Sequence, residues 1–273
     1  MRLLRARRPA GSAGGAVFAS AASVLPPAEA PAVCPSFAPP AWLAGATGRG
    51  VRVAIIDSGW DPEIDDVRVL PGFAIDRSAG QLRISDDDRD RIGHGTGATH
   101  QVLALAPEAS VLPIRVFGER LETSPGAIVA ALDLAVEQGV DVMSLSLGTT
   151  REDAVRPLYA ACERARRAGA IVVAAGDNFG EASYPAVFDH VIGVTMAVFR
   201  SPYEYRYRPD EALEIEAWGV RQPVPTLGGR IVLTTGTSVA APNVTGIVAL
   251  LRQLHPGATL ERIRALLAAH AID

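Results

Sequence analysis

Short apolar runs alternate with amphipathic stretches along most of the chain. Six runs rich in β-branched residues predict strands, at 51–56, 111–116, 140–145, 171–175, 191–195 and 231–234. Helical spacing of apolar positions predicts helices over 125–138, 152–168, 239–254 and 260–270. Several of these stretches are followed by a glycine or a proline that would end a helix. The alternation predicts an α/β fold with a mostly parallel central sheet and helices on both faces.

The first 38 residues differ from the rest, since they are rich in Ala, Pro, Gly and Arg and have no lasting period. We therefore expect one folded domain over 39–273 and an extension over 1–38. The extension has two interpretations. It is a secretory signal with a basic start at 1–8, an apolar stretch at 13–25 and a cleavage site at 28–30, or it is a flexible cytoplasmic segment. Glycines and serines interrupt the apolar stretch, which favours the cytoplasmic interpretation, and the stretch is too short and polar to span a membrane.

Composition narrows the class of protein. A content of 48% hydrophobic and 21% charged residues in 273 residues fits a globular domain with a sizeable core. A net charge of −4 argues against a nucleic-acid partner, because phosphate binding needs a concentrated basic face. Cys34 and Cys162 could pair in an exported protein, but the apolar side of a predicted helix carries Cys162, which favours a buried free thiol. The absence of lysine excludes a Ser-Lys dyad.

Three segments carry residues suited to nucleophilic catalysis. Asp57 follows a buried strand, His94 stands in a glycine-rich turn that leads into a helix, and Ser238 stands where a second such turn enters an apolar helix. Serine is a weak nucleophile until a neighbouring base, itself held by a third group, takes its proton. Together the three residues supply each of these roles.

In the chain order Asp57, His94, Ser238 these segments resemble the subtilisin-like serine proteases. The resemblance extends from Trp42 to the C-terminus. It implies the three-layer subtilisin-like fold and a serine endopeptidase that works through an acyl-enzyme. It also implies that His94 is the general base, that Asp57 orients it and that Ser238 is the nucleophile.

The oxyanion site departs from the family pattern. Subtilisin-like proteases usually have an asparagine after a strand ending Ala-Ala-Gly, whereas this chain has Asp177 at that position and Asn178 next to it. An ionised carboxylate would repel the forming negative charge. Asp177 could therefore contribute only when protonated, and a shifted turn would offer Asn178 instead.

By the same resemblance, an extended peptide substrate pairs with the chain as an added strand. The residues implied for one wall of the groove are Ser146, Leu147 and Gly148. Those implied for the pocket of the residue before the cut are Ala174, Ala175 and Gly176. Both walls are small and uncharged, which predicts a small or apolar substrate side chain there.

Other polar features are given structural interpretations. The acidic run 86–90 is interpreted as a solvated loop, with a position over the substrate channel or calcium binding as alternatives. The remaining histidines lack metal-ligand spacing and are expected at the surface or in satisfied core positions; they are His100, His190, His255 and His270. We expect no metal and no cofactor. A period-two pattern over 203–207 predicts an edge strand or a ribbon.

The expected partner is a peptide or protein substrate. Only residues 1–38 precede the predicted domain, so we expect a compact form without a large prodomain, similar to subtilases that remove leader segments from precursors. Two alternatives stay open on the same fold. One is a pseudoprotease that binds peptides without cutting them, and the other is a transpeptidase or macrocyclase that uses the same acyl-enzyme.

Overall fold

A computed structural model of the chain describes residues 17–18, 34–78, 80–179 and 182–273. Most of the expected N-terminal extension, including the proposed signal features at 1–8 and 28–30, lies outside the described residues. Val17–Phe18 forms strand β1, which pairs antiparallel with β6, Glu122–Thr123. Within the described ranges, no helix combines the length and the apolar character needed to cross a bilayer.

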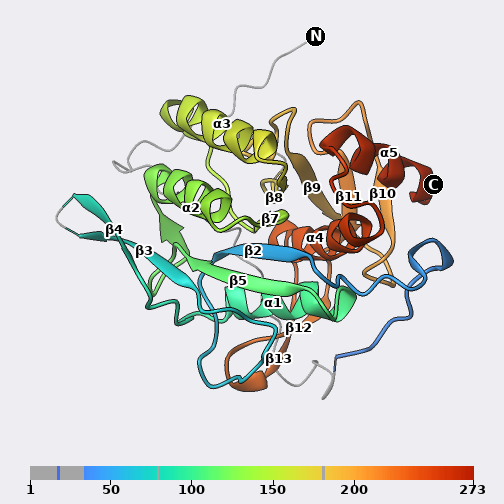
Figure 1. Ribbon diagram of the computed structural model, residues 1–273, viewed down its shortest axis with the longest axis horizontal. Coiled ribbons are helices and arrows are strands. Elements are labelled where there is room, and N and C mark those ends of the chain that lie inside the picture. The colour runs from blue at the N-terminus through green and yellow to red at the C-terminus, as the bar shows by residue number, and fades with distance from the viewer. Residues whose placement is uncertain (1–16, 19–33, 79, 180–181) are drawn as a thin grey trace, which may run out of the picture.

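A nine-stranded sheet crosses the centre of the described structure in the order β10-β11-β9-β8-β7-β2-β5-β3-β4 (Figure 1). Most neighbours are parallel, and the pairs β10/β11 and β3/β4 at the two edges are antiparallel. The strands are β2 Arg52–Asp57, β3 Phe73–Ser78, β4 Gln81–Ser85, β5 Ser110–Arg115, β7 Val142–Leu145, β8 Ile171–Ala175, β9 Ile192–Ala197, β10 Tyr205–Tyr207 and β11 Ile215–Trp218.

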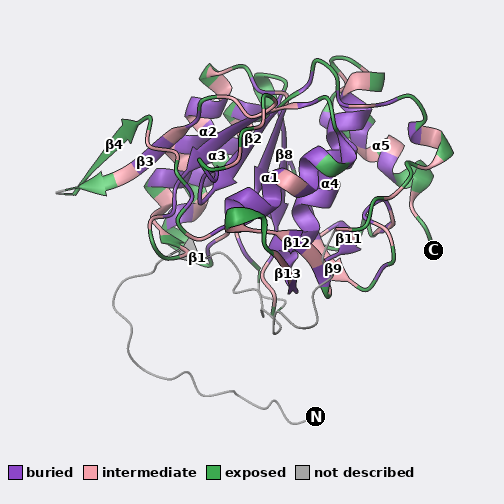
Figure 2. Ribbon diagram, turned by 90° about the horizontal axis from the view of Figure 1, so that it is seen from below, coloured by how far each residue is buried: buried purple, intermediate pink, exposed green. Residues whose placement is uncertain are grey.

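Helices cover both faces of this sheet (Figure 2). They are α1 His94–Leu105, α2 Pro125–Glu137, α3 Glu152–Arg167, α4 Thr237–Leu254 and α5 Leu260–His270. Alternate residues of β2 point to opposite faces: Val53 packs in the core formed with α1, α4 and α5, and Ala54 packs in the core formed with α2 and α3. The predicted three-layer α/β fold with a mostly parallel sheet is confirmed.

Most predicted elements lie within two residues of the observed ones, but 231–234 does not belong to the central sheet. As β13, Ile231–Thr234, it pairs antiparallel with β12, Gln222–Pro225, in a separate hairpin. Its β-branched residues form a strand as expected, but the chain enters α4 three residues later and does not join the sheet. The period-two pattern was correct, since β10 is an edge strand of the large sheet.

Candidate active site

The carboxyl ends of three adjacent parallel strands bring candidate residues to one edge of the sheet. Asp57 is the last residue of β2, Ser146 directly follows β7, and Asp177 is the second residue after β8. The sheet order β8-β7-β2 makes these ends neighbours. The expectation that polar groups gather at this edge is therefore confirmed.

A buried Asp57 and a partly buried His94 form a hydrogen-bonded pair. His94 Nδ1 lies 2.8 Å from Asp57 Oδ1 and 2.9 Å from Oδ2. The Ser58 N–H donates to the same Oδ1 at 2.7 Å, and the Ser58 hydroxyl oxygen accepts the Gly95 N–H at 2.7 Å. Ser58 therefore connects the end of β2 with the first turn of α1. The carboxylate fixes the imidazole so that Nδ1 carries the shared proton and Nε2 stays available.

The local charges keep His94 basic. Burial alone would lower the pKa of His94, but the negative charge and hydrogen bond of Asp57, together with the charge of Asp90, raise that pKa above its ordinary value. A raised pKa favours the imidazolium form, which is the form that a general base adopts after it has taken a proton.

The glycine after His94 allows α1 to begin directly against β2. A Cβ at Gly95 would lie 2.5 Å from the Gly59 carbonyl oxygen and 3.1 Å from the Ser58 nitrogen. Both are backbone atoms, so no side-chain movement could relieve the contact. Only glycine fits at position 95, which explains why the residue after His94 has no side chain.

Ser238 is the second residue of α4 and is 2% exposed. Among the described residues its hydroxyl has no hydrogen-bond partner. The backbone around it is fixed, because the Ser146 hydroxyl donates to the Ser238 carbonyl at 2.9 Å. In addition, the Gln101 side-chain amide of α1 donates to the Val239 carbonyl at 2.9 Å, and α1 packs against α4. The helices that begin at His94 and at Thr237 are thus held together.

The turn after β8 presents Asn178, not Asp177, to the start of α4. The Asn178 side-chain oxygen accepts the Thr237 N–H at 2.8 Å and lies 3.1 Å from the Thr237 hydroxyl. A Cβ built on Gly236 would lie 3.2 Å from Ser238 Oγ and 3.7 Å from Asn178 Nδ2, so the amide and the hydroxyl lie near the same glycine. Asp177 instead accepts the Phe179 N–H at 2.7 Å.

The residues implied for substrate binding have different environments. Ser146 and Leu147 are buried, and the hydroxyl of Ser146 is engaged by the Ser238 carbonyl. Gly148 lies against Ser183, since an added Cβ would be 3.1 Å from the Ser183 hydroxyl oxygen. Within β8, the side chains of Ala174 and Ala175 are packed in the two cores. Any contact of these two alanines with a peptide would therefore involve their main chain.

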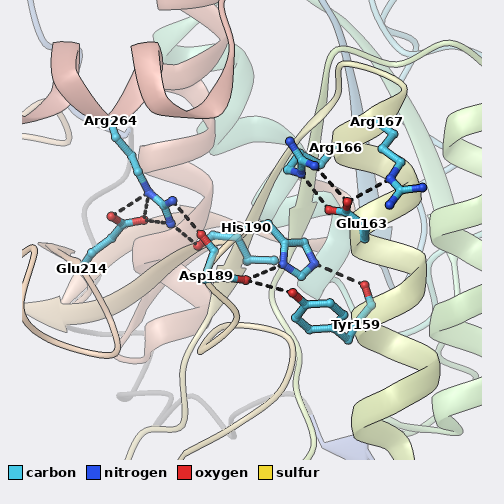
Figure 3. A network of polar contacts seen from close by, with 9 residues as sticks. Tyr159, Glu163, Arg166, Arg167, Asp189, His190, Glu214 and Arg264 are labelled. Atoms are coloured by element: carbon cyan, nitrogen blue, oxygen red, sulfur yellow. Dashed lines mark hydrogen bonds and ion pairs between the residues drawn. The ribbon is translucent and has the colours of Figure 1, made fainter.

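A polar network anchors the loop between β8 and β9, which carries Ser183 (Figure 3). His190 lies 2.8 Å from Asp189 Oδ1 through Nδ1 and 3.2 Å from the Tyr159 carbonyl oxygen of α3 through Nε2. Arg264 of α5 donates to the carbonyl of Asp189 at 2.7 Å and also pairs with Glu214. His190 is therefore a satisfied core residue, as expected from the sequence. The loop beside Gly148 is held from two helices.

A scan of known families matches the subtilase family, peptidase S8, over residues 48–272. The chain belongs to the subtilase family. This membership assigns it to the serine-type endopeptidases and agrees with the resemblance carried by the three motifs.

Several named proteases are similar to this subtilase. The Major intracellular serine protease of Bacillus subtilis is 32% identical over 239 residues, which cover 79% of this chain and 72% of that protein. Subtilisin Savinase of Lederbergia lenta is 30% identical over 238 residues, covering 83% of this chain and 85% of that protein. The Minor extracellular protease Epr of Bacillus subtilis is 26% identical over 245 residues, and the match spans only 37% of its length.

Sequence reasoning missed the residues that support the motifs. Ser58 and Asp90 contact the first turn of α1, yet neither was singled out. Asp90 carried no distinguishing signal in the sequence, because it belongs to the acidic run 86–90 and lies three residues before Gly93, the N-cap of α1. In the described part of the chain, no three His, Cys, Asp or Glu side chains converge as metal ligands. The expectation that no metal or cofactor is needed stays a prediction.

Proposed function

We propose that Asp57, His94 and Ser238 form the catalytic triad of a peptidase that hydrolyses peptide bonds through an acyl-enzyme. The observation that carries this proposal is the partly buried 2.8 Å contact between Asp57 and His94 at the start of a helix packed against the helix of Ser238. In the reaction, His94 Nε2 takes the Ser238 proton as the oxygen attacks the scissile carbonyl. His94 then returns the proton to the leaving amine, while Asp57 stabilises the imidazolium.

Asn178 is the side-chain donor to the oxyanion in this proposal, with the backbone N–H of Ser238 as its partner. Two observations support Asn178: its oxygen is occupied by Thr237, and its amide lies close to Gly236, which also neighbours Ser238 Oγ. The N-terminus of α4 adds favourable dipoles to the same place. Asp177 accepts a hydrogen bond from its own turn and has no direct catalytic role.

The proposed substrate is an extended peptide segment of a protein precursor, bound along residues 144–148 within a peptidase domain over 39–273. Gly148 and Gly176 are assigned to the groove by the sequence resemblance; in the structure the space that a Cβ would fill is taken by Ser183 at Gly148 and by the Leu213 side chain at Gly176. A dedicated role in leader removal, and a cytoplasmic location, are predictions from the sequence.

A peptide library incubated with the wild type and with Ser238→Ala tests this function. We expect new peptide termini and the addition of water, seen by mass spectrometry, with the wild type alone. A fluorophosphonate probe should label the wild type and not Ser238→Ala. The absence of both labelling and cleavage would favour a pseudoprotease. Ligated or cyclic products that lack the water added by hydrolysis would favour a transpeptidase, because one peptide bond is then exchanged for another. Both results would contradict the proposed hydrolase.

A further inference from the structure

The acidic run 86–90 contains one residue that does not behave as a solvated loop. Asp86 is exposed, as the sequence predicted, but Asp90 is 6% exposed and lies under the first turn of α1. The interpretation as a solvated loop is therefore wrong for Asp90. A carboxylate is seldom buried unless hydrogen-bond donors or charges compensate for the loss of water.

Four donors converge on the Asp90 carboxylate. Oδ1 accepts the N–H groups of Ile92 and Gly93, each at 2.8 Å. Oδ2 accepts the Thr96 N–H at 2.9 Å and the Thr96 hydroxyl at 2.7 Å. Three of these donors are backbone N–H groups: those of Ile92 and Gly93 directly before α1, and that of Thr96 in its first turn, where intrahelical partners are lacking. Gly93, directly before the helix, has no side chain with which to supply that cap.

These contacts lie on both sides of His94 in the chain. Gly93 precedes His94 and Thr96 follows it by two residues. The Asp90 carboxylate therefore holds the backbone on both sides of His94, and this backbone sets the orientation of the imidazole. Asp90 is also a charge in the vicinity of His94. The charged groups that act on His94 are Asp57, from the end of β2, and Asp90, from the loop before α1, and both favour the imidazolium.

We propose that Asp90 is a positioning residue for the base of this peptidase: its buried carboxylate fixes the backbone on both sides of His94 and supplies a second negative charge to the imidazole. The proposal rests on the proposed role of His94 as general base. Asp57 contacts the imidazole ring directly. Asp90 instead holds the backbone at the start of α1 and stabilises the imidazolium through its negative charge.

Asp90→Asn separates this role from simple helix capping. The amide has nearly the same shape but no charge, and it offers one acceptor oxygen where the carboxylate offers two. We expect kcat/KM to fall by about ten- to a hundred-fold, because the imidazole of His94 is held less precisely in the orientation needed for proton transfer. We also expect the acid limb of the pH profile of kcat/KM to move to lower pH, because the imidazolium loses a stabilising charge.

Two variants serve as matched controls. Thr96→Val removes one hydrogen bond to Asp90 but keeps its charge, so it should lower kcat/KM while leaving the acid limb in place. Asp88→Asn removes a half-buried carboxylate of the same run that accepts the Gly72 N–H, and it should leave both the rate and the acid limb unchanged. An acid limb that is the same in Asp90→Asn and in the wild type would overturn the electrostatic role.

If Asp90→Asn does not fold, Asp90→Glu and Thr96→Val still decide the question. Both keep a negative charge but disturb the hydrogen-bonded frame, so kcat/KM should fall with an unmoved acid limb. Unchanged kcat/KM in both variants would overturn the positioning role. A wild-type chain that neither cleaves peptides nor reacts with a fluorophosphonate would instead contradict the proposed function, which keeps the two failures distinct.

Discussion

The side-chain oxygen of Asn178 accepts the backbone N–H of Thr237 at 2.8 Å, which joins the turn after β8 to the residue before Ser238. The Thr237 hydroxyl lies 3.1 Å from the same oxygen and donates to the Gly176 carbonyl at 2.6 Å. Both contacts are made by the oxygen end of the amide, so in the proposed function its nitrogen end faces the substrate. On that proposal, Asn178 serves the oxyanion and Asp177 does not.

Asn178→Ala should lower kcat by about 10²–10³ with little change in KM, a magnitude known from removal of an oxyanion donor in a related subtilisin. Steady-state kinetics on a peptide found in the library would measure it. Asp177→Asn is the matched control and should stay near the wild type, because Asp177 bonds its own turn through Phe179. A large loss in Asp177→Asn together with a small loss in Asn178→Ala would reverse the assignment.

The pH dependence of kcat/KM should show an acid limb above pH 6.5, the ordinary pKa of histidine, because the pKa of His94 is raised. Below its pKa the imidazole already holds a proton and cannot accept one from Ser238, so activity rises as pH increases through that value. Asp57→Asn removes the charge and the hydrogen bond that favour the imidazolium. The limb should then move to lower pH while kcat falls by about 10⁴, since the tautomer is no longer fixed. An acid limb in the wild type below pH 6.5 would contradict this prediction.

The elements whose bounds were predicted well are flanked by residues that end helices and strands. β8 and α5 have the predicted bounds, and each is flanked by glycine or proline. The hairpin of β3 and β4 was missed although β4 alternates polar and apolar residues, because its run of five residues is short and carries only two apolar side chains, Leu82 and Ile84, both of which are exposed. β12 was missed because Pro223 and Pro225 argue against a strand, yet they fit a two-stranded hairpin outside the main sheet.

The candidate site was predictable where a motif fixes both residue type and backbone shape. Asp57 ends a strand, His94 begins a helix, and Ser238 is the second residue of a helix. The sequence patterns that mark this strand end and these helix starts can be recognised without the structure. Asn178 could not be chosen over Asp177, since the choice depends on the course of one turn. Asp90 could not be separated from its acidic neighbours, because only the folded chain shows which carboxylate receives the N–H groups of α1.

Gly95→Ala should inactivate the peptidase and lower its melting temperature. The new Cβ would lie 2.5 Å from the Gly59 oxygen, so α1 must move away from β2 and carry His94 from Asp57. A displacement of about 1 Å at a reacting group can lower the rate about a hundred-fold. Gly118→Ala is the control, since no atom lies within 4 Å of its added Cβ. Thermal unfolding and kinetics on both variants measure the effect, and normal activity in Gly95→Ala would contradict it.

Cys162 should resist alkylation in the folded chain. Both cysteines are free, and Cys162 is buried on the core-facing side of α3, where burial raises the pKa of its thiol to about 12. Cys34 is only partly buried, although burial raises the pKa of its thiol as well. Iodoacetamide at pH 8 followed by peptide mass spectrometry should modify Cys34 first and Cys162 only after denaturation. Equal rates for the two, or a Cys34–Cys162 disulfide in the purified chain, would contradict the prediction.

Arg264→Ala should destabilise the loop between β8 and β9, which packs against Gly148 of the proposed substrate-binding segment. Arg264 donates to the carbonyls of Asp189 and Val191 and pairs with Glu214, whose side chain is 10% exposed. Loss of the guanidinium leaves that carboxylate poorly compensated, at a cost of about 2 kcal/mol, below the range for fully buried pairs because Arg264 is partly exposed. In a chain of this size such a loss lowers the melting temperature by roughly 4–8 °C.

The kinetic effect of Arg264→Ala should appear mainly in KM. The anchored loop carries Ser183, which packs against Gly148, one of the residues proposed to bind the substrate, whereas Asp57 and His94 are held by separate contacts at the end of β2. A looser loop therefore weakens binding of the substrate more than it disturbs proton transfer. Arg262→Ala, an exposed position on the same helix, controls for the loss of a positive charge and should change neither quantity. A fall in kcat with KM unchanged would show that the loop supports the triad itself.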